Sequence, residues 1–186
     1  MSKALSIKVF SDGAVLETML HDLNSGLVTG FTTNPSLMKK AGITSYIGFA
    51  KDVLKEITDY PVSFEVFADD LEGMEQEARR IAALGDNVYV KIPVTNSKGE
   101  STAPLIDRLT AEGIKVNVTA IFTVEQVREV VDALKSGTPA VVSVFAGRIA
   151  DTGVDPMPIM REALAICREK EGVELLWASP RETFNI

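Results

Sequence analysis

One lysine stands inside an apolar run that indicates a β-strand, N-V-Y-V-K-I-P-V-T at residues 87–95. A buried ammonium without a partner is costly, so lysine is rarely buried. Lys91 has two interpretations: its stem alone is covered and the charge reaches solvent, or it is a desolvated amine that forms a Schiff base with a ketone, because burial favours the neutral amine that this chemistry requires. The second is favoured by the residues that would seal the strand's other face, Val88, Val90, Ile92 and Val94.

Two carboxylates stand in comparable places. Asp12 ends the run S-I-K-V-F-S-D and is either the N-cap of the following helix or a general acid/base beside the imine. Glu65 lies in the middle of V-S-F-E-V-F-A, where an unpaired carboxylate would be costly. We therefore expect Glu65 to be functional, and to order a water that takes part in imine formation and hydrolysis.

Amides and hydroxyls stand near the ends of other apolar runs. Thr32 and Asn34 fall in T-T-N-P-S, where the asparagine is either a turn or cap residue or a substrate ligand. Asn117 and Thr119 are alternate residues of one run and therefore point to the same side of a strand. Ser143 stands in the next run along the chain.

Two arginines follow the last two apolar runs. Arg148 comes after Gly147, and Arg181 comes after the run that also contains Ser179. Guanidinium groups on neighbouring loops are suited to clamp a phosphate, which arginine binds in a bidentate manner. Surface ion pairing is the other interpretation for each arginine.

The remaining chemistry-bearing residues indicate no site. His21 is the sole histidine and is expected on a helix surface, and Cys167 is the sole cysteine and is expected to be a buried thiol. An intramolecular disulfide is therefore impossible, and neither a metal site nor a cysteine–histidine nucleophile pair is supported. We expect no metal and no cofactor.

These residues need elements that bring them together. Apolar β-branched runs, each followed by a segment of helical period, cover residues 6–12, 26–35, 61–68, 87–94, 114–122, 139–147 and 173–179. This alternation predicts a parallel sheet covered by helices, either a (β/α)8 barrel or an open doubly wound sheet. Because polar candidates follow nearly every run and a barrel brings strand ends to one mouth, we favour the barrel. The G-x-G-x-x-G and P-loop motifs of nucleotide folds are absent from the sequence.

The chain as a whole is expected to form one domain, residues 1–186. It ends just after Arg181, where a seventh helix should begin, so we expect a barrel truncated before strand 8, with two unpaired sheet edges. The net charge of −7 and the scattered basic residues argue against nucleic acid and anionic membranes as partners. With no membrane-spanning apolar run and no signal peptide, the sequence predicts a soluble cytoplasmic protein. A homo-oligomer is compatible with this expectation.

Several motifs together resemble one family. G-F-T-T-N-P-S-L-M, V-Y-V-K-I-P-V-T, V-N-V-T-A-I-F, V-S-V-F-A-G-R-I and W-A-S-P-R-E resemble the transaldolase family, including its small members and the related fructose-6-phosphate aldolases. The resemblance covers essentially the whole chain. It also places Lys91 on the fourth strand, where this family carries its Schiff-base lysine.

The resemblance implies a role for each candidate. Lys91 would form the imine that holds a dihydroxyacetone unit, Asp12 would take the proton from the C4 hydroxyl, and Glu65 with Thr119 would position the catalytic water. The dihydroxyacetone unit would be bound by Asn34, Asn117 and Ser143, with Thr32 nearby. The phosphate of fructose 6-phosphate, sedoheptulose 7-phosphate or an acceptor aldose phosphate would be bound by Arg148, Ser179 and Arg181.

Two positions separate the branches of this family. The aldolase branch typically has Gln at the position of Glu65 and Tyr at the position of Phe145, so both residues point to transaldolase, although Phe145 could also be a core aromatic. The first strand departs from the family by ending in Ser-Asp-Gly rather than Asp-Thr. The alternatives are a fructose-6-phosphate aldolase that releases dihydroxyacetone and a non-catalytic sugar-phosphate binder.

Overall fold

One parallel sheet organises residues 6–181, the part of the chain that the computed structural model describes. Its seven strands follow chain order from edge to edge, and each pairs in parallel with the next. They are β1 (Phe10–Asp12), β2 (Gly30–Thr32), β3 (Val62–Glu65), β4 (Val88–Pro93), β5 (Val116–Ile121), β6 (Ala140–Val144) and β7 (Val173–Trp177). The expected strand–helix alternation is confirmed.

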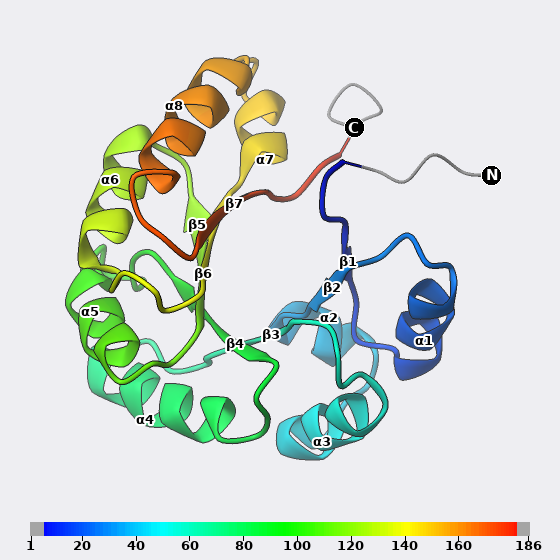
Figure 1. Ribbon diagram of the computed structural model, residues 1–186. Coiled ribbons are helices and arrows are strands. Elements are labelled where there is room, and N and C mark those ends of the chain that lie inside the picture. Colours follow the sequence, from blue (N-terminus) through cyan, green and yellow to red (C-terminus); the bar gives the residue numbers. More distant parts are fainter. Residues whose placement is uncertain (1–5, 182–186) are drawn as a thin grey trace.

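The helices lie on the outer side of this sheet, which curls into a half-barrel (Figure 1). They are α1 (Leu16–Asn24), α2 (Pro35–Lys40), α3 (Tyr46–Glu56), α4 (Leu71–Ala82), α5 (Ala103–Ala111), α6 (Val124–Ala133), α7 (Ala146–Asp151) and α8 (Met157–Cys167). A doubly wound sheet would carry helices on both faces. The fold is therefore of the (β/α)8-barrel type.

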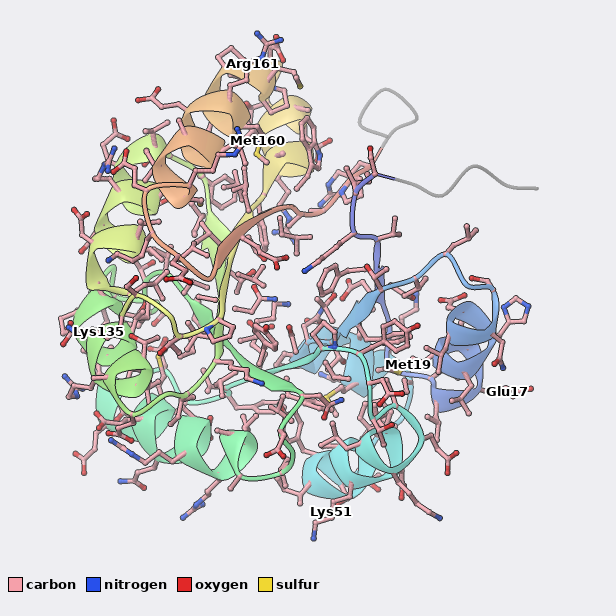
Figure 2. The ribbon with its side chains drawn as sticks, in the orientation of Figure 1. Glu17, Met19, Lys51, Lys135, Met160 and Arg161 are labelled. Carbon is pink, nitrogen blue, oxygen red and sulfur yellow. The ribbon has the colours of Figure 1, made fainter. Side chains whose placement is uncertain are left out.

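The hydrophobic core lies between the sheet and these helices. On β4, Val88, Val90 and Ile92 are at most 3% exposed, whereas the residues between them are only partly buried. Burying such a side chain stabilises the fold by about 1.5–3 kcal/mol. Met19 of α1 turns inward to this core, whereas Glu17 and Lys51 lie at the periphery and point away from the sheet (Figure 2). The alternate strand residues are thereby left to face the inside of the curl.

The strands are shorter than the apolar runs that predicted them, and one helix was not expected. The first strand covers only Phe10–Asp12, because its pairing with β2 begins at Gly30. The short helix α7 directly follows β6, where no helix was expected. Its sequence, A-G-R-I-A-D, has too few apolar residues to show a helical period.

The two edges of the sheet are β1 and β7, and within residues 6–181 neither has a second strand partner. A side-chain contact joins the two ends instead, since Lys8 Nζ lies 2.5 Å from the Glu174 carboxylate of β7. The expected seventh helix falls at residues 182–186, outside the described residues. Within the described part, no helix is long and apolar enough to cross a membrane.

Candidate active site

Lys91 lies beside Glu65, because β3 and β4 pair with these two residues in register. Lys91 Nζ is 3.1 Å from the Glu65 carboxylate and donates to the backbone carbonyl of Thr33 at 3.3 Å. The side chains of Lys91 and Glu65 are only 11% and 19% exposed. Two partners thus offset the cost of burying the amine, and at 11% exposure more of the Lys91 side chain than its stem is covered.

Tyr46 holds Glu65 from outside the sheet. This first residue of α3 donates its hydroxyl to the Glu65 carbonyl at 2.8 Å, and its ring packs against Phe64 and Phe67. Burial, with the charges of Glu65 and Glu77 adding to it, raises the pKa of Tyr46 well above its ordinary value, so the hydroxyl remains a donor. Tyr46 was not among the sequence candidates, since nothing in a helical run indicates which strand its hydroxyl reaches.

Asp12 faces its neighbour on β2. Its carboxylate accepts the Thr32 hydroxyl at 2.7 Å, and the two residues are in register. The N-cap interpretation of Asp12 is wrong, because α1 begins after Val15 and has no side-chain cap.

For Asn34 the cap interpretation is confirmed: its side-chain oxygen accepts the Leu37 N–H at 3.0 Å and so starts α2, while the amide nitrogen keeps its donor capacity.

Asn117 lies next to Lys91 in the register of β4 and β5, and its amide is fixed from both ends. The Ser143 hydroxyl donates to Asn117 Oδ1 at 2.7 Å, and Asn117 Nδ2 donates to Ser63 Oγ at 3.0 Å. All three side chains are at most 2% exposed. One N–H of the amide remains for a ligand. Ser63 was missed, although its place two residues before Glu65 puts both on one face of β3.

Thr119 lies on the same strand, just before an irregularity. Its hydroxyl is buried and has no hydrogen-bond partner within residues 6–181. The pairing of β5 with β6 shifts between Val118 and Ile121, and Ala120 adopts a left-handed φ of 59°. One extra residue on β5 thus makes a β-bulge, a feature that often re-aims side chains beside active sites.

An edge-to-face aromatic pair follows the bulge. Phe122 and Phe145 have ring centroids 5.6 Å apart with planes at 71°, and the guanidinium carbon of Arg148 lies 4.7 Å from the Phe145 ring centroid. Phe145 is only partly buried and supports a cation, so it is more than a core aromatic. Phe122 was not among the sequence candidates.

The other phosphate candidates gather at α7, which carries Arg148. Gly147 packs against the segment after β7 so closely that a Cβ would come within 1.7 Å of the Ser179 carbonyl oxygen. Arg181 Nε lies 2.8 Å from the Asp151 carboxylate at the end of this helix. The structure therefore brings Arg148, Ser179 and Arg181 to one short helix, and for Arg181 the ion-pair interpretation is confirmed.

His21 and Cys167 take no part in this cluster. The His21 side chain is 85% exposed on α1. Cys167 is 1% exposed, and burial raises the pKa of its thiol to about 11. Among the described residues, no group of three or more His, Cys, Asp or Glu side chains is arranged to hold a metal ion.

Fold and site together define a protein of the (β/α)8-barrel class, with a buried lysine, carboxylates and amides at the carboxyl ends of its parallel strands. A family model described as transaldolase/fructose-6-phosphate aldolase matches residues 9–186. The chain belongs to this family.

Named relatives agree with this membership. A probable transaldolase of Methanococcus maripaludis is 42% identical over 163 residues, which cover 86% of this chain and 70% of the relative. A probable transaldolase of a Thermoanaerobacter species is 35% identical over 181 residues, 97% of this chain and 79% of the relative. An uncharacterised TIM-barrel protein of Bordetella bronchiseptica superposes with a TM-score of 0.56 at 14% identity, over 87% of this chain and 58% of that one, which supports the fold alone.

Proposed function

We propose that the protein is a transaldolase, which transfers a dihydroxyacetone unit between sugar phosphates through a Schiff base on Lys91. The observation that carries this proposal is the buried amine of Lys91, 3.1 Å from the Glu65 carboxylate. The family match and the names of the relatives support it. The proposed pairs are sedoheptulose 7-phosphate with glyceraldehyde 3-phosphate and erythrose 4-phosphate with fructose 6-phosphate, in the pentose phosphate pathway of the cytoplasm.

Imine formation requires Lys91 as a free amine. Glu65 lies close enough to accept the ammonium proton directly. The amine then adds to the ketose carbonyl carbon, and the carbinolamine loses its hydroxyl as water, with the proton for that water returning from Glu65. Thr119 offers this water a second hydrogen bond, because its buried hydroxyl lacks a partner in the described chain. Hydrolysis reverses these steps.

Carbon–carbon cleavage uses Asp12. Its carboxylate takes the proton of the C4 hydroxyl while the C3–C4 bond breaks, and the electron pair neutralises the iminium ion to an enamine. Carbon C4 leaves as the aldehyde of an aldose phosphate. The enamine then adds to the aldehyde carbon of the acceptor, and Asp12 returns the proton to the new hydroxyl. The Thr32 hydroxyl, 2.7 Å away, orients the carboxylate.

Substrate binding divides between two groups of residues. The free N–H of Asn117, with Asn34 and Ser143, binds the hydroxyls of the dihydroxyacetone unit. Around α7, Arg148, Ser179 and Arg181 bind the phosphate. Because Phe145 offers no hydroxyl to protonate or bind a released ketone, we propose transfer rather than release.

The decisive experiment traps the imine. The protein is incubated with fructose 6-phosphate and borohydride, and intact mass and peptide mapping are then measured. We expect a three-carbon adduct on Lys91, which a Lys91→Ala variant lacks. A folded protein that forms no adduct would contradict the proposal.

A second assay separates transfer from release. Fructose 6-phosphate turnover is measured with and without erythrose 4-phosphate. A transaldolase turns over only with the acceptor. Equal turnover without it would instead identify an aldolase that releases dihydroxyacetone, and a melting temperature raised by fructose 6-phosphate without turnover would identify a binder.

A further inference from the structure

Phe122 is a large apolar side chain that remains 39% exposed at the carboxyl end of β5. We propose that Phe122 is a positioning residue for phosphorylated substrates: it fixes the ring of Phe145, and through that ring it orients the guanidinium of Arg148 toward the substrate phosphate. This inference rests on the proposed function and extends it to a residue outside the predicted site.

The bulge on β5 places Phe122 against Phe145. Val118 pairs with Val142 and Ile121 with Val144, so β5 uses three steps where β6 uses two. The extra residue is Ala120, at a left-handed φ that costs roughly 1–2 kcal/mol for a residue with a Cβ. Phe122 therefore follows Ile121 as Phe145 follows Val144, and the two rings meet at the strand ends.

The first turn of α6 holds the backbone of Phe122. The Gln126 side chain accepts the N–H groups of Phe122 and Thr123, and the Thr123 hydroxyl accepts the Gln126 N–H. This capping box fixes the backbone directly after the bulge. A fixed backbone allows the Phe122 ring to restrain the ring beside it.

The two aromatic contacts form a chain that ends at a cation. The near-perpendicular arrangement of Phe122 and Phe145 is the T-shaped geometry that aromatic pairs prefer. The Phe145 ring also lies within cation–π distance of Arg148. Movement of Phe145 would therefore displace the guanidinium.

Arg148 differs in its charge partners from Arg181, the other arginine proposed to bind the phosphate. Arg181 pairs with Asp151. Arg148 makes no ion pair within residues 6–181, and the ring of Phe145 is its cation partner there. A ring face holds a guanidinium without using its N–H donors, so the donors stay available for bidentate binding of a phosphate.

The test compares three variants. Phe122→Leu removes the ring, Phe122→Tyr keeps it, and Phe67→Leu is the matched control, a phenylalanine 53% exposed after β3 whose ring contacts Tyr46 instead. Two affinities are measured for each: the dissociation constant of inorganic phosphate by titration calorimetry, and the concentration of unphosphorylated dihydroxyacetone that half-saturates borohydride trapping on Lys91.

We expect Phe122→Leu to weaken phosphate binding about two- to fivefold, the range of an exposed cation–π contact, and to leave dihydroxyacetone trapping unchanged. Phe122→Tyr should match the parent protein in both, and Phe67→Leu, whose ring packs against the Tyr46 that holds Glu65, should match it in phosphate binding. A parent that binds no phosphate, or a Phe122→Leu variant that weakens both ligands equally, would overturn the inference. A parent that binds phosphate but forms no adduct would refute the proposed function alone, since phosphate affinity still tests the role of Phe122.

A double-mutant cycle tests the route through Arg148. Arg148→Lys keeps the charge but loses the planar group that stacks on Phe145. In this background Phe122→Leu should weaken phosphate binding no further. An unchanged two- to fivefold effect in the lysine background would show that Phe122 acts by another route.

Discussion

Buried hydroxyls at the candidate site fall into two kinds. Ser63 and Ser143 each bond to Asn117, so their desolvation is offset. Thr119 has no such partner in the described chain and carries the cost of a buried, unsatisfied hydroxyl. A residue that weakens the fold in this way indicates a functional demand at its position.

Replacing Thr119 should therefore separate stability from activity. Thr119→Val keeps the shape and removes the unsatisfied hydroxyl, so we expect the free energy of unfolding to stay equal or rise by about 1 kcal/mol. Turnover of fructose 6-phosphate with erythrose 4-phosphate should fall at least about tenfold, because the water loses a ligand. Urea unfolding and steady-state kinetics measure the two quantities.

Ser63→Ala is the matched contrast for this variant. It leaves a buried N–H of Asn117 without its acceptor, so it should lower the free energy of unfolding by about 1–3 kcal/mol. If Thr119→Val destabilises the protein as much as Ser63→Ala does, the Thr119 hydroxyl has a structural partner and the water-binding role is wrong.

Cys167 gives the fold a pH dependence on the alkaline side. Burial raises the pKa of its thiol from 9.0 to about 11 in the folded protein. The unfolded chain therefore loses this proton first, and the stability contributed by the neutral buried thiol is lost as the pH rises from about 9 to 11. The loss should reach about 2 kcal/mol at pH 11.

The measurement is the free energy of unfolding at pH 8 and pH 10.5, compared between the parent and Cys167→Ala. The parent should lose more stability over this interval, whatever the two proteins' absolute stabilities. Parallel pH profiles would mean that Cys167 ionises equally in the folded and unfolded states.

At the scale of the element, β5 departs from regular geometry to serve the site. The regular alternation predicted Asn117 and Thr119 on one side of a strand, which the register with β4 supports. The bulge could not be predicted, because its extra residue is an alanine and not the glycine that usually marks a left-handed position. Phe122 was missed because the bulge, which sets its ring against Phe145, was not predictable.

This geometry makes the side chain at position 120 critical. A β-branched residue is a strong outlier at positive φ, so Ala120→Val should lower the free energy of unfolding by about 1–2 kcal/mol. Ala120→Gly, the matched control, relieves the strain but adds freedom to the unfolded chain, so its stability should stay within about 1 kcal/mol of the parent. Urea unfolding measures both, and equal stability of the two variants would contradict the bulge.

Other elements were predictable to different degrees. The order of strands and helices follows from β-branched runs and helical periods. Partners across strands were not predictable, because register decides them. Glu65 was predicted to order a water and was not paired with Lys91, yet β3 and β4 place the two residues side by side. The role that links Glu65 to water stays a prediction.

At the scale of the whole molecule, the curl of the sheet sets strands from distant segments around one half-barrel (Figure 1). Asp12 and Ser179 are far apart in sequence, but Asp12 ends β1 and Ser179 follows β7, and these parallel strands run the same way around the half-barrel (Figure 1). The polar residues at the strand ends favoured this arrangement over an open sheet. Only the structure gives the contact between the sheet's two ends, Lys8 with Glu174, since Lys8 precedes the strand it accompanies.

We propose that residues 1–186 unfold as one domain. The buried core is continuous from Met19 on α1 to Cys167 on α8, and neighbouring strands pair along the whole sheet. A shared core couples the two halves, so loss of either half exposes apolar surface of the other. Trp177, the single tryptophan, reports on β7 by fluorescence, while far-ultraviolet circular dichroism reports on helices along the whole chain. The urea midpoints from the two probes should coincide. A tryptophan transition at lower urea than the helical one would show that the β7 edge opens separately, and the site around α7 would then be the part of the molecule that a bound phosphate stabilises most.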